Sequence, residues 1–176
     1  MLNTDDTTII CIDIQEKLAK IASGKIIQNT IKLMKASAVL NINTIITEQY
    51  PKGLGETIPE IKNIKDFLTV EKTTFSAYQT EEFKQKFDKI NNKNVLICGI
   101  ETHICVLQTA LDLIKKNYNV YILSDCSASR EEYNHNTALE LFKNKGGNII
   151  TLEIALFEFL KSSKHPNFKE IQSLIK

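Results

Sequence analysis

The fold is best approached from residues 94–105, which read Asn94-Val95-Leu96-Ile97-Cys98-Gly99-Ile100-Glu101-Thr102-His103-Ile104-Cys105. The first six residues form the clearest strand candidate in the chain, because a nearly unbroken apolar run is typical of a strand covered on both faces. A helix is expected next, from about His103 to Lys116. A buried strand that leads into a helix is the repeating unit of a parallel sheet with crossover helices.

The same unit recurs on both sides of this stretch. Strands are expected at residues 7–13, 43–48, 66–72, 94–99, 119–125 and 148–152, and helices at 25–40, 80–90, 103–116, 154–160 and 168–175. In the first helix Ile27, Ile31, Met34 and Ala38 are three or four residues apart and share one face. This alternation predicts a single α/β domain over residues 1–176, a three-layer α/β/α, doubly wound, Rossmann-like six-stranded parallel sheet.

Two local motifs indicate the limits of one more helix, after the fifth strand. Ser129-Arg130-Glu131-Glu132 has the spacing of a capping box and predicts that the helix opens there. Gly146-Gly147 predicts its end, because glycine readily adopts the left-handed conformation that often follows a helix.

Composition narrows the classes of partner. Lys and Arg number 22 and Asp and Glu 21, and the net charge of +1 gives no reason to expect nucleic acid or an acidic membrane surface as partner. No apolar run reaches the roughly 18 residues that a membrane span needs. The N-terminus lacks the basic and apolar regions of a signal peptide. The four cysteines form no C-x-x-C pair, so a cytoplasmic protein with reduced thiols is expected.

Three predicted strand ends carry reactive side chains, and the active site of a parallel sheet lies beyond those ends. Asp13 ends the first strand, Lys72 ends the third, and Cys105 lies just past the fourth. If Thr102 caps the following helix, the helix dipole favours a Cys105 thiolate, and a nearby lysine lowers the pKa of the thiol further. A carboxylate can accept the thiol proton and later activate water.

Each of these residues also has an ordinary structural interpretation. A carboxylate at a strand end is often a helix cap, a single lysine is usually a solvated surface charge, and a cysteine early in a helix is often a small buried apolar residue. The pattern alone leaves open whether the three side chains converge.

Four short motifs, spread in order over nearly the whole chain, resemble those of the isochorismatase-like hydrolase superfamily. They are Cys11-Ile12-Asp13-Ile14-Gln15, Glu71-Lys72-Thr73-Thr74-Phe75-Ser76, Gly99-Ile100-Glu101-Thr102-His103-Ile104-Cys105-Val106 and Ser124-Asp125-Cys126-Ser127-Ala128-Ser129-Arg130. Residues 47–55 and 107–113 carry a closer likeness to small isochorismatase domain-containing proteins of unknown substrate.

The resemblance implies a cysteine hydrolase that acts on a small molecule, with a catalytic triad of Asp13, Lys72 and Cys105. It implies a cis peptide between Ile100 and Glu101, and oxyanion donors in the backbone N–H groups of Glu101 and Cys105. It also implies a homo-oligomer, either a dimer or a tetramer, and no cofactor.

Two departures from relatives narrow the chemistry. Nicotinamidases carry an aspartate and two histidines after the second strand, where this chain has Glu48-Gln49-Tyr50, and its histidines all lie downstream (His103, His135 and His165). No metal site is therefore expected. Isochorismatases that cleave a vinyl ether lack the cysteine nucleophile that Cys105 supplies here. Thiol acyl transfer on an amide or related C–N bond is the expected reaction.

Further residues are assigned by their place in the loops. The candidate pocket walls are Gln15, Leu18, Tyr50, Phe75 and Tyr78. His103 lies two positions from Cys105, and helix positions two apart point in different directions, so it is not the expected base. Ser129, Arg130 and Asp125 are expected to organise the loop and helix after the fifth strand, and a contribution of Asp125 or His103 to the site stays open.

Two other classes of function remain as alternatives. The chain can be a non-catalytic oligomeric interaction module that keeps the hydrolase fold, although such a module has no need of all three reactive groups. A nucleotide-binding α/β domain is disfavoured, because the turn Ile14-Gln15-Glu16-Lys17 has no glycine-rich phosphate loop.

Overall fold

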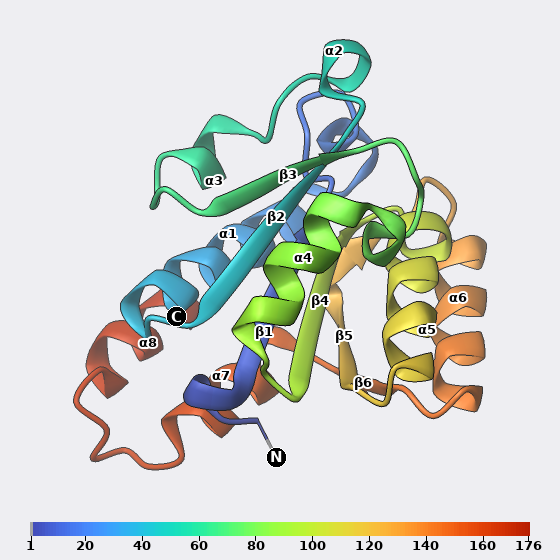
Figure 1. Cartoon of the computed structure of the whole chain (residues 1–176). Helices are drawn as coiled ribbons and strands as arrows, with labels where there is room; N and C mark the ends of the chain where they lie inside the picture. The colour runs from blue at the N-terminus through green and yellow to red at the C-terminus, as the bar shows by residue number, and fades with distance from the viewer. Residues whose placement is uncertain (1) are drawn as a thin grey trace.

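A computed structural model describes residues 2–176 and contains a six-stranded sheet in the order β3-β2-β1-β4-β5-β6, in which all neighbours run parallel (Figure 1). The strands are β1 (Thr7–Ile12), β2 (Asn43–Gln49), β3 (Leu68–Lys72), β4 (Asn94–Ile100), β5 (Asn119–Ala128) and β6 (Asn148–Ile150). This arrangement confirms the α/β class and the parallel six-stranded sheet predicted from the alternating pattern.

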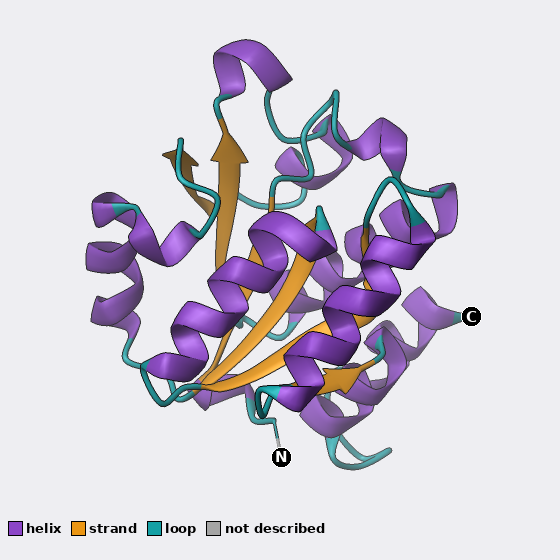
Figure 2. Ribbon diagram, turned by 90° about the vertical axis from the view of Figure 1, so that its right-hand side faces the viewer, coloured by secondary structure: helices purple, strands orange, loops and turns teal. Residues whose placement is uncertain are grey.

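Helices cover both faces of the sheet (Figure 2). One layer contains α1 (Gly24–Val39), α3 (Pro59–Lys62), α7 (Leu152–Leu160) and α8 (Phe168–Ile175); the other contains α4 (Glu81–Ile90), α5 (Leu107–Lys115) and α6 (Glu132–Asn144). Short helical turns complete the structure: α2 (Pro51–Leu54), the 3₁₀ turns η1 (Thr4–Asp6), η2 (Ala19–Ile21) and η3 (Ala77–Gln79), and the π-helical turn η4 (Thr102–Val106). Within residues 2–176, no helix combines the length and apolarity of a bilayer span.

Strand β1 shows how one sequence supplies two cores. Its six residues are all buried. Ile9 and Cys11 belong to the cluster under α1 and α7, whereas Ile10 and Ile12 belong to the cluster under α4, α5 and α6. Successive side chains of a strand point to opposite faces, so an unbroken apolar run fills both layers at once.

Glycine at position 99 lets the end of β4 approach β1. Its φ is 133°, and a Cβ there would lie 2.0 Å from the carbonyl oxygen of Ile12. The pairing of β4 with β5 also shifts register between Ile97 and Gly99. Only glycine tolerates both the dihedral angle and the close approach, and the residues that follow are delivered next to the end of β1.

Two expected helix caps are wrong. Helix α6 begins at Glu132 and has no side-chain cap, because the Ser129 hydroxyl is instead paired with His103 Nδ1 at 2.9 Å. Thr102 is likewise not a cap: its hydroxyl is paired with His135 Nδ1 at 2.9 Å, and the chain makes a π-helical turn before α5 begins. Both hydroxyls are engaged by distant side chains that no local pattern reveals.

Candidate active site

The carboxyl ends of β1 and β3 bring Asp13 and Lys72 into a buried ion pair. Lys72 Nζ donates to Asp13 Oδ2 at 2.8 Å, and neither side chain has any solvent-exposed area. The Thr47 hydroxyl donates to Asp13 Oδ1 at 2.7 Å. The Asp13 N–H donates to the Thr47 carbonyl at 3.1 Å, which holds Asp13 at a φ of 54°. Both carboxylate oxygens therefore have fixed partners.

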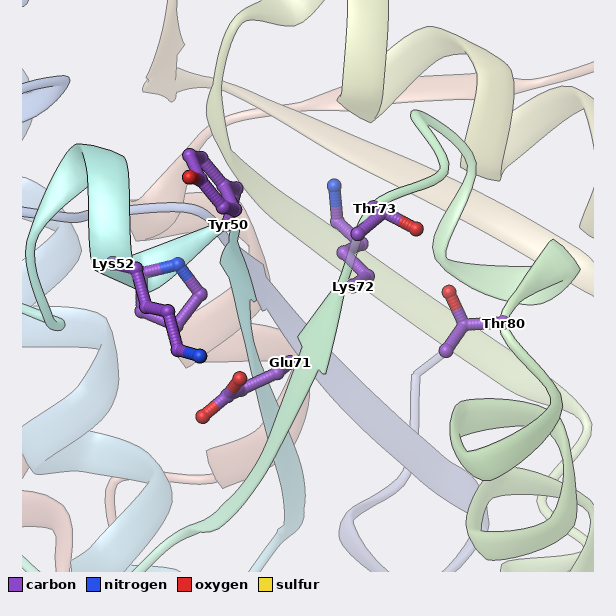
Figure 3. A pocket seen from close by; sticks show the side chains of 7 residues that line it. Tyr50, Lys52, Glu71, Lys72, Thr73 and Thr80 are labelled. Atoms are coloured by element: carbon purple, nitrogen blue, oxygen red, sulfur yellow. The ribbon is translucent and has the colours of Figure 1, made fainter.

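The Lys72 ammonium has further acceptors from the loops around it. It donates to Gln49 Oε1 at 2.6 Å and lies 3.3 Å from the carbonyl oxygens of Thr74 and Phe75. Figure 3 shows its amino group pointing away from Glu71, as expected for adjacent residues of a strand. Lys72 is also among the residues that line a separate surface pocket of about 320 Å³, together with Tyr50 and Thr80. The ammonium is thus fixed beside Asp13 from several directions.

Cys105 lies in the π-helical turn after β4, is 7% exposed and interacts with both members of the ion pair. Burial, followed by the negative charge of Asp13 and a hydrogen bond with it, raises the pKa of the thiol to about 12, whereas Lys72 lowers this pKa by less. The expected lowering of the thiol pKa is therefore wrong, since desolvation outweighs the cation. Burial thus favours the neutral form of the thiol.

The pKa of Asp13 is raised above its ordinary value. Burial is the main cause, and it outweighs the opposing effects of Lys72, Thr47 and the Cys105 hydrogen bond. A carboxylate with a raised pKa accepts a proton more readily, which suits it to proton transfer with the neighbouring thiol.

Asp13 and Cys105 open onto one small cavity of about 180 Å³. The residues that line it come from the carboxyl end of the sheet and the loops above: Asp13, Leu18, Gln49, Leu54, Phe75, Ile100, Glu101, Ile104, Cys105 and Arg130. Lys72 is not among them. It acts on the cavity through Asp13 and Cys105, since it interacts with both.

A second ion pair, Glu101 with Arg130, borders the same cavity. The Arg130 side chain donates from Nη2 to Oε1 at 2.7 Å and from Nε to Oε2 at 3.1 Å, and its backbone N–H donates to Oε2 at 3.0 Å. Burial raises the pKa of Glu101, but the hydrogen bonds and charge of Arg130 prevail and leave this pKa below its usual value. The peptide bond between Ile100 and Glu101 is cis.

The expected pocket walls divide into two groups. Leu18 and Phe75 line the cavity. Gln15 does not: it is fully buried, and its amide donates to the carbonyls of Gln49 and Gly55. Tyr50 is 56% exposed and lines the separate pocket of Figure 3. Tyr78 packs edge-to-face against Phe87, so it too is placed away from the cavity.

The remaining polar candidates have structural partners. His103 Nδ1 is paired with Ser129, and Asp125 Oδ1 accepts from the N–H of Leu152 at 2.8 Å at the start of α7. Glu48 accepts from both the N–H and the hydroxyl of Thr57 at 2.7 Å. Among residues 2–176, no group of three or more His, Cys, Asp or Glu is placed to hold a metal ion.

Sequence reasoning missed four residues of the cavity: Gln49, Leu54, Ile104 and the cavity-facing role of Arg130. Gln49 had a usable signal, because it is the last residue of β2 and strand ends meet at the same edge of a parallel sheet. Arg130 had none, since its pairing with Glu101 joins segments 29 positions apart.

Comparisons with known proteins agree with this arrangement. An isochorismatase domain matches residues 7–154, and the chain belongs to the isochorismatase family, whose members are generally hydrolases. Isochorismatase domain-containing protein 2 of Xenopus laevis is 35% identical over 177 residues, covering 99% of this chain and 85% of that protein.

Solved structures show the same fold. One described as the MAR1 ribonuclease of Caenorhabditis elegans is 35% identical, with a TM-score of 0.92 over 99% of this chain and 91% of that one. YcaC of Escherichia coli, described as an octameric hydrolase of unknown specificity, is 21% identical, with a TM-score of 0.89 over 98% and 94% of the two chains. At that identity the likeness concerns the fold alone.

Proposed function

We propose that the protein is a cysteine hydrolase that cleaves an amide or related C–N bond of a small molecule through a thioester intermediate. The observation that carries the proposal is the shared cavity: Asp13 and the Cys105 thiol line one small opening, and Lys72 forms a fully buried ion pair with Asp13. A nucleophile, a base within reach of its proton and a charge that positions the base are the parts that covalent acyl transfer needs.

The first half of the reaction makes the thioester. Asp13 accepts the Cys105 proton as the sulfur attacks the substrate carbonyl carbon, and Lys72 stabilises the charges that develop. The N–H groups of Glu101 and Cys105 receive the oxyanion. Asp13 then gives the proton to the departing nitrogen, so the C–N bond breaks and an amine or ammonia leaves.

The second half restores the enzyme. A water molecule gives a proton to Asp13 and attacks the thioester carbonyl, and the carboxylic acid product leaves as the sulfur regains a proton from Asp13. The raised pKa of Asp13 supports both directions of transfer, because the same group must accept and return a proton in each half.

The alternative of a non-catalytic module is less well supported. Burying two charges costs several kcal/mol per ion before their mutual attraction is counted, and a well-packed apolar pair of similar volume is often as stable. An ion pair with no exposed area that faces a thiol is therefore better explained by chemistry than by architecture.

Assembly is part of the proposal, since related folds form oligomers. The E. coli neighbour is described as octameric. For this chain we propose a dimer or a tetramer, which light scattering on the purified protein tests directly. A monomer at micromolar concentration would contradict it.

The function is tested by replacing Cys105 with alanine and measuring ammonia release from a panel of primary amides. We expect complete loss of turnover with an unchanged fold. Cys126→Ala is the matched control, because Cys126 is a buried thiol of the other core layer and should keep activity. Intact-mass detection of an acyl adduct on Cys105 supports the thioester, and full activity of Cys105→Ala overturns it.

The same experiment should include a ribonuclease assay, because the C. elegans structure is described as a ribonuclease. Incubation with single-stranded RNA should give no cleavage by this protein. RNA cleavage that disappears in Cys105→Ala would replace the amide proposal.

A further inference from the structure

We infer that the substrate is an uncharged amide whose acyl group is apolar and about the size of a benzene ring. This inference rests on the proposed function and adds the class of substrate to it. Two features of the cavity support it. The cavity is small and mainly apolar, and each charged side chain that borders it is already paired with another side chain of the protein.

The size of the cavity limits the substrate. At about 180 Å³ it lies below the roughly 300–1,000 Å³ typical of pockets for drug-sized ligands. An apolar cavity of about 150 Å³ is known to hold benzene. The space above Cys105 therefore fits a short branched or aromatic acyl group.

The lining selects for apolar character. Leu18, Leu54, Phe75, Ile100 and Ile104 make up half of the lining residues and surround the reactive groups. Phe75 is 55% exposed, which is high for a large aromatic side chain. An apolar acyl group that covers this ring and the leucines gains the free energy of burying apolar surface.

The charges at the cavity are already paired. Asp13 is matched by Lys72, and Glu101 is matched by Arg130 through three N–H donors. A substrate carboxylate would meet two carboxylates and no unpaired cation. A substrate ammonium would have to displace Lys72 or Arg130 from its partner. Either charge would lose hydration and find no cation or carboxylate whose charge is not already neutralised, which is costly in a small apolar space.

A matched pair of thiol reagents tests the selectivity. Iodoacetamide and iodoacetate have nearly the same size and differ in charge. Each forms a C–S bond to Cys105 while the C–I bond breaks, iodide leaves, and the thiol proton passes to Asp13 and on to water. Rates are measured at pH 8 by intact mass, with 2-mercaptoethanol as the reference for intrinsic reactivity and Cys105→Ala as the blank.

We expect Cys105 to prefer iodoacetamide by about tenfold more than the reference thiol does, because only the neutral reagent enters without an unpaired charge. A preference no larger than that of the reference overturns the inference and leaves Cys105 as the nucleophile. Failure of both reagents to label Cys105 in the folded protein overturns the proposed nucleophile itself, so the two failures are distinguishable.

A charge placed in the cavity should change the preference. Leu18→Arg adds an unpaired cation to the lining and should shift labelling toward iodoacetate, whereas Leu141→Arg makes the same change at a 41%-exposed position on α6 and should shift nothing. Equal behaviour of the two variants counts against the cavity as the origin of the selectivity.

Turnover gives an independent measurement with two isosteric amides. 3-Methylbutanamide and malonamate share a CH₂–CONH₂ unit and differ in carrying an isopropyl group or a carboxylate. Ammonia release should occur with the first at a kcat/KM at least about tenfold higher than with the second. A higher value for malonamate overturns the inference.

Discussion

Two ion pairs each contribute a carboxylate to the lining of one cavity, and the pairs differ in exposure. Asp13 and Lys72 have no exposed side-chain area, whereas the Arg130 side chain is 62% exposed next to a 7%-exposed Glu101 side chain. Each carboxylate has a cation as its partner, yet burial prevails at Asp13 and raises its pKa, and hydrogen bonding prevails at Glu101 and lowers its pKa. The comparison shows that the environment, rather than the partner, decides which carboxylate exchanges protons.

The largest expected effect concerns the Asp13–Lys72 pair, called the inner pair below. Removal of its cation should lower the stability of the fold. Lys72→Met keeps the length of the side chain but leaves Asp13 as a buried, unpaired carboxylate, so the free energy of unfolding should fall by about 3–5 kcal/mol. Urea denaturation followed by circular dichroism measures this. The double variant Asp13→Asn/Lys72→Met should recover much of the loss, because no unpaired charge remains.

A loss below about 1 kcal/mol in Lys72→Met would place the inner pair among ordinary surface pairs and remove the difference on which the comparison depends. Both variants should be inactive, because the single variant loses the cation that positions Asp13 and the double variant also loses the base.

The sequence predicts where the candidate residues lie when strand ends decide their position, and it does not predict what the tertiary environment decides. Asp13, Lys72 and Cys105 were identifiable because apolar runs mark the strands and parallel strands end at one edge. The direction of the Cys105 pKa shift was missed, because it depends on how completely surrounding segments bury the thiol. The Glu101–Arg130 pairing was missed because side chains 29 positions apart meet only in the folded chain.

The next largest expected effect is on the pH dependence of stability. Asp13 and Glu101 should change the free energy of unfolding in opposite directions as pH falls. Because folding raises the pKa of Asp13, the folded state binds this proton more tightly. Wild type should therefore gain stability relative to Asp13→Asn as pH falls through the raised pKa, above its ordinary value of 3.8. Glu101 has a lowered pKa, so its contribution is present above its ordinary value of 4.5 and is lost as pH falls toward the folded value.

Urea midpoints of wild type, Asp13→Asn and Glu101→Gln across acidic pH measure these two differences. The sign of each slope is the test, because Arg130 is exposed and solvent weakens the size of the Glu101 effect. If the two stability differences changed with pH in the same direction, the difference in exposure between the two ion pairs would not explain how their carboxylates titrate.

The Glu101–Arg130 pair, called the outer pair below, should have the smallest effect on stability. Its effect on turnover should be larger. Arg130→Gln removes the exposed member of the pair and leaves the backbone N–H of residue 130 to donate to Glu101, so the free energy of unfolding should change by less than about 1 kcal/mol. Arg130 nevertheless holds the Glu101 carboxylate through three donors, and Glu101 carries one of the proposed oxyanion N–H groups. We expect kcat to fall by about tenfold with a smaller change in KM, since a displaced donor weakens the transition state more than the bound substrate.

Two further variants test whether Arg130 acts by positioning Glu101 or only as a surface charge. Arg130→Lys keeps the charge and one donor and should recover part of kcat. Lys115→Gln breaks another exposed pair, with Asp112 at 3.1 Å, and should match Arg130→Gln in stability while leaving turnover unchanged. If Arg130→Gln raised KM and left kcat intact, Arg130 would contact the substrate directly instead of holding Glu101. The outer pair would then be part of the binding surface, and an anionic group on the substrate would become compatible with this cavity.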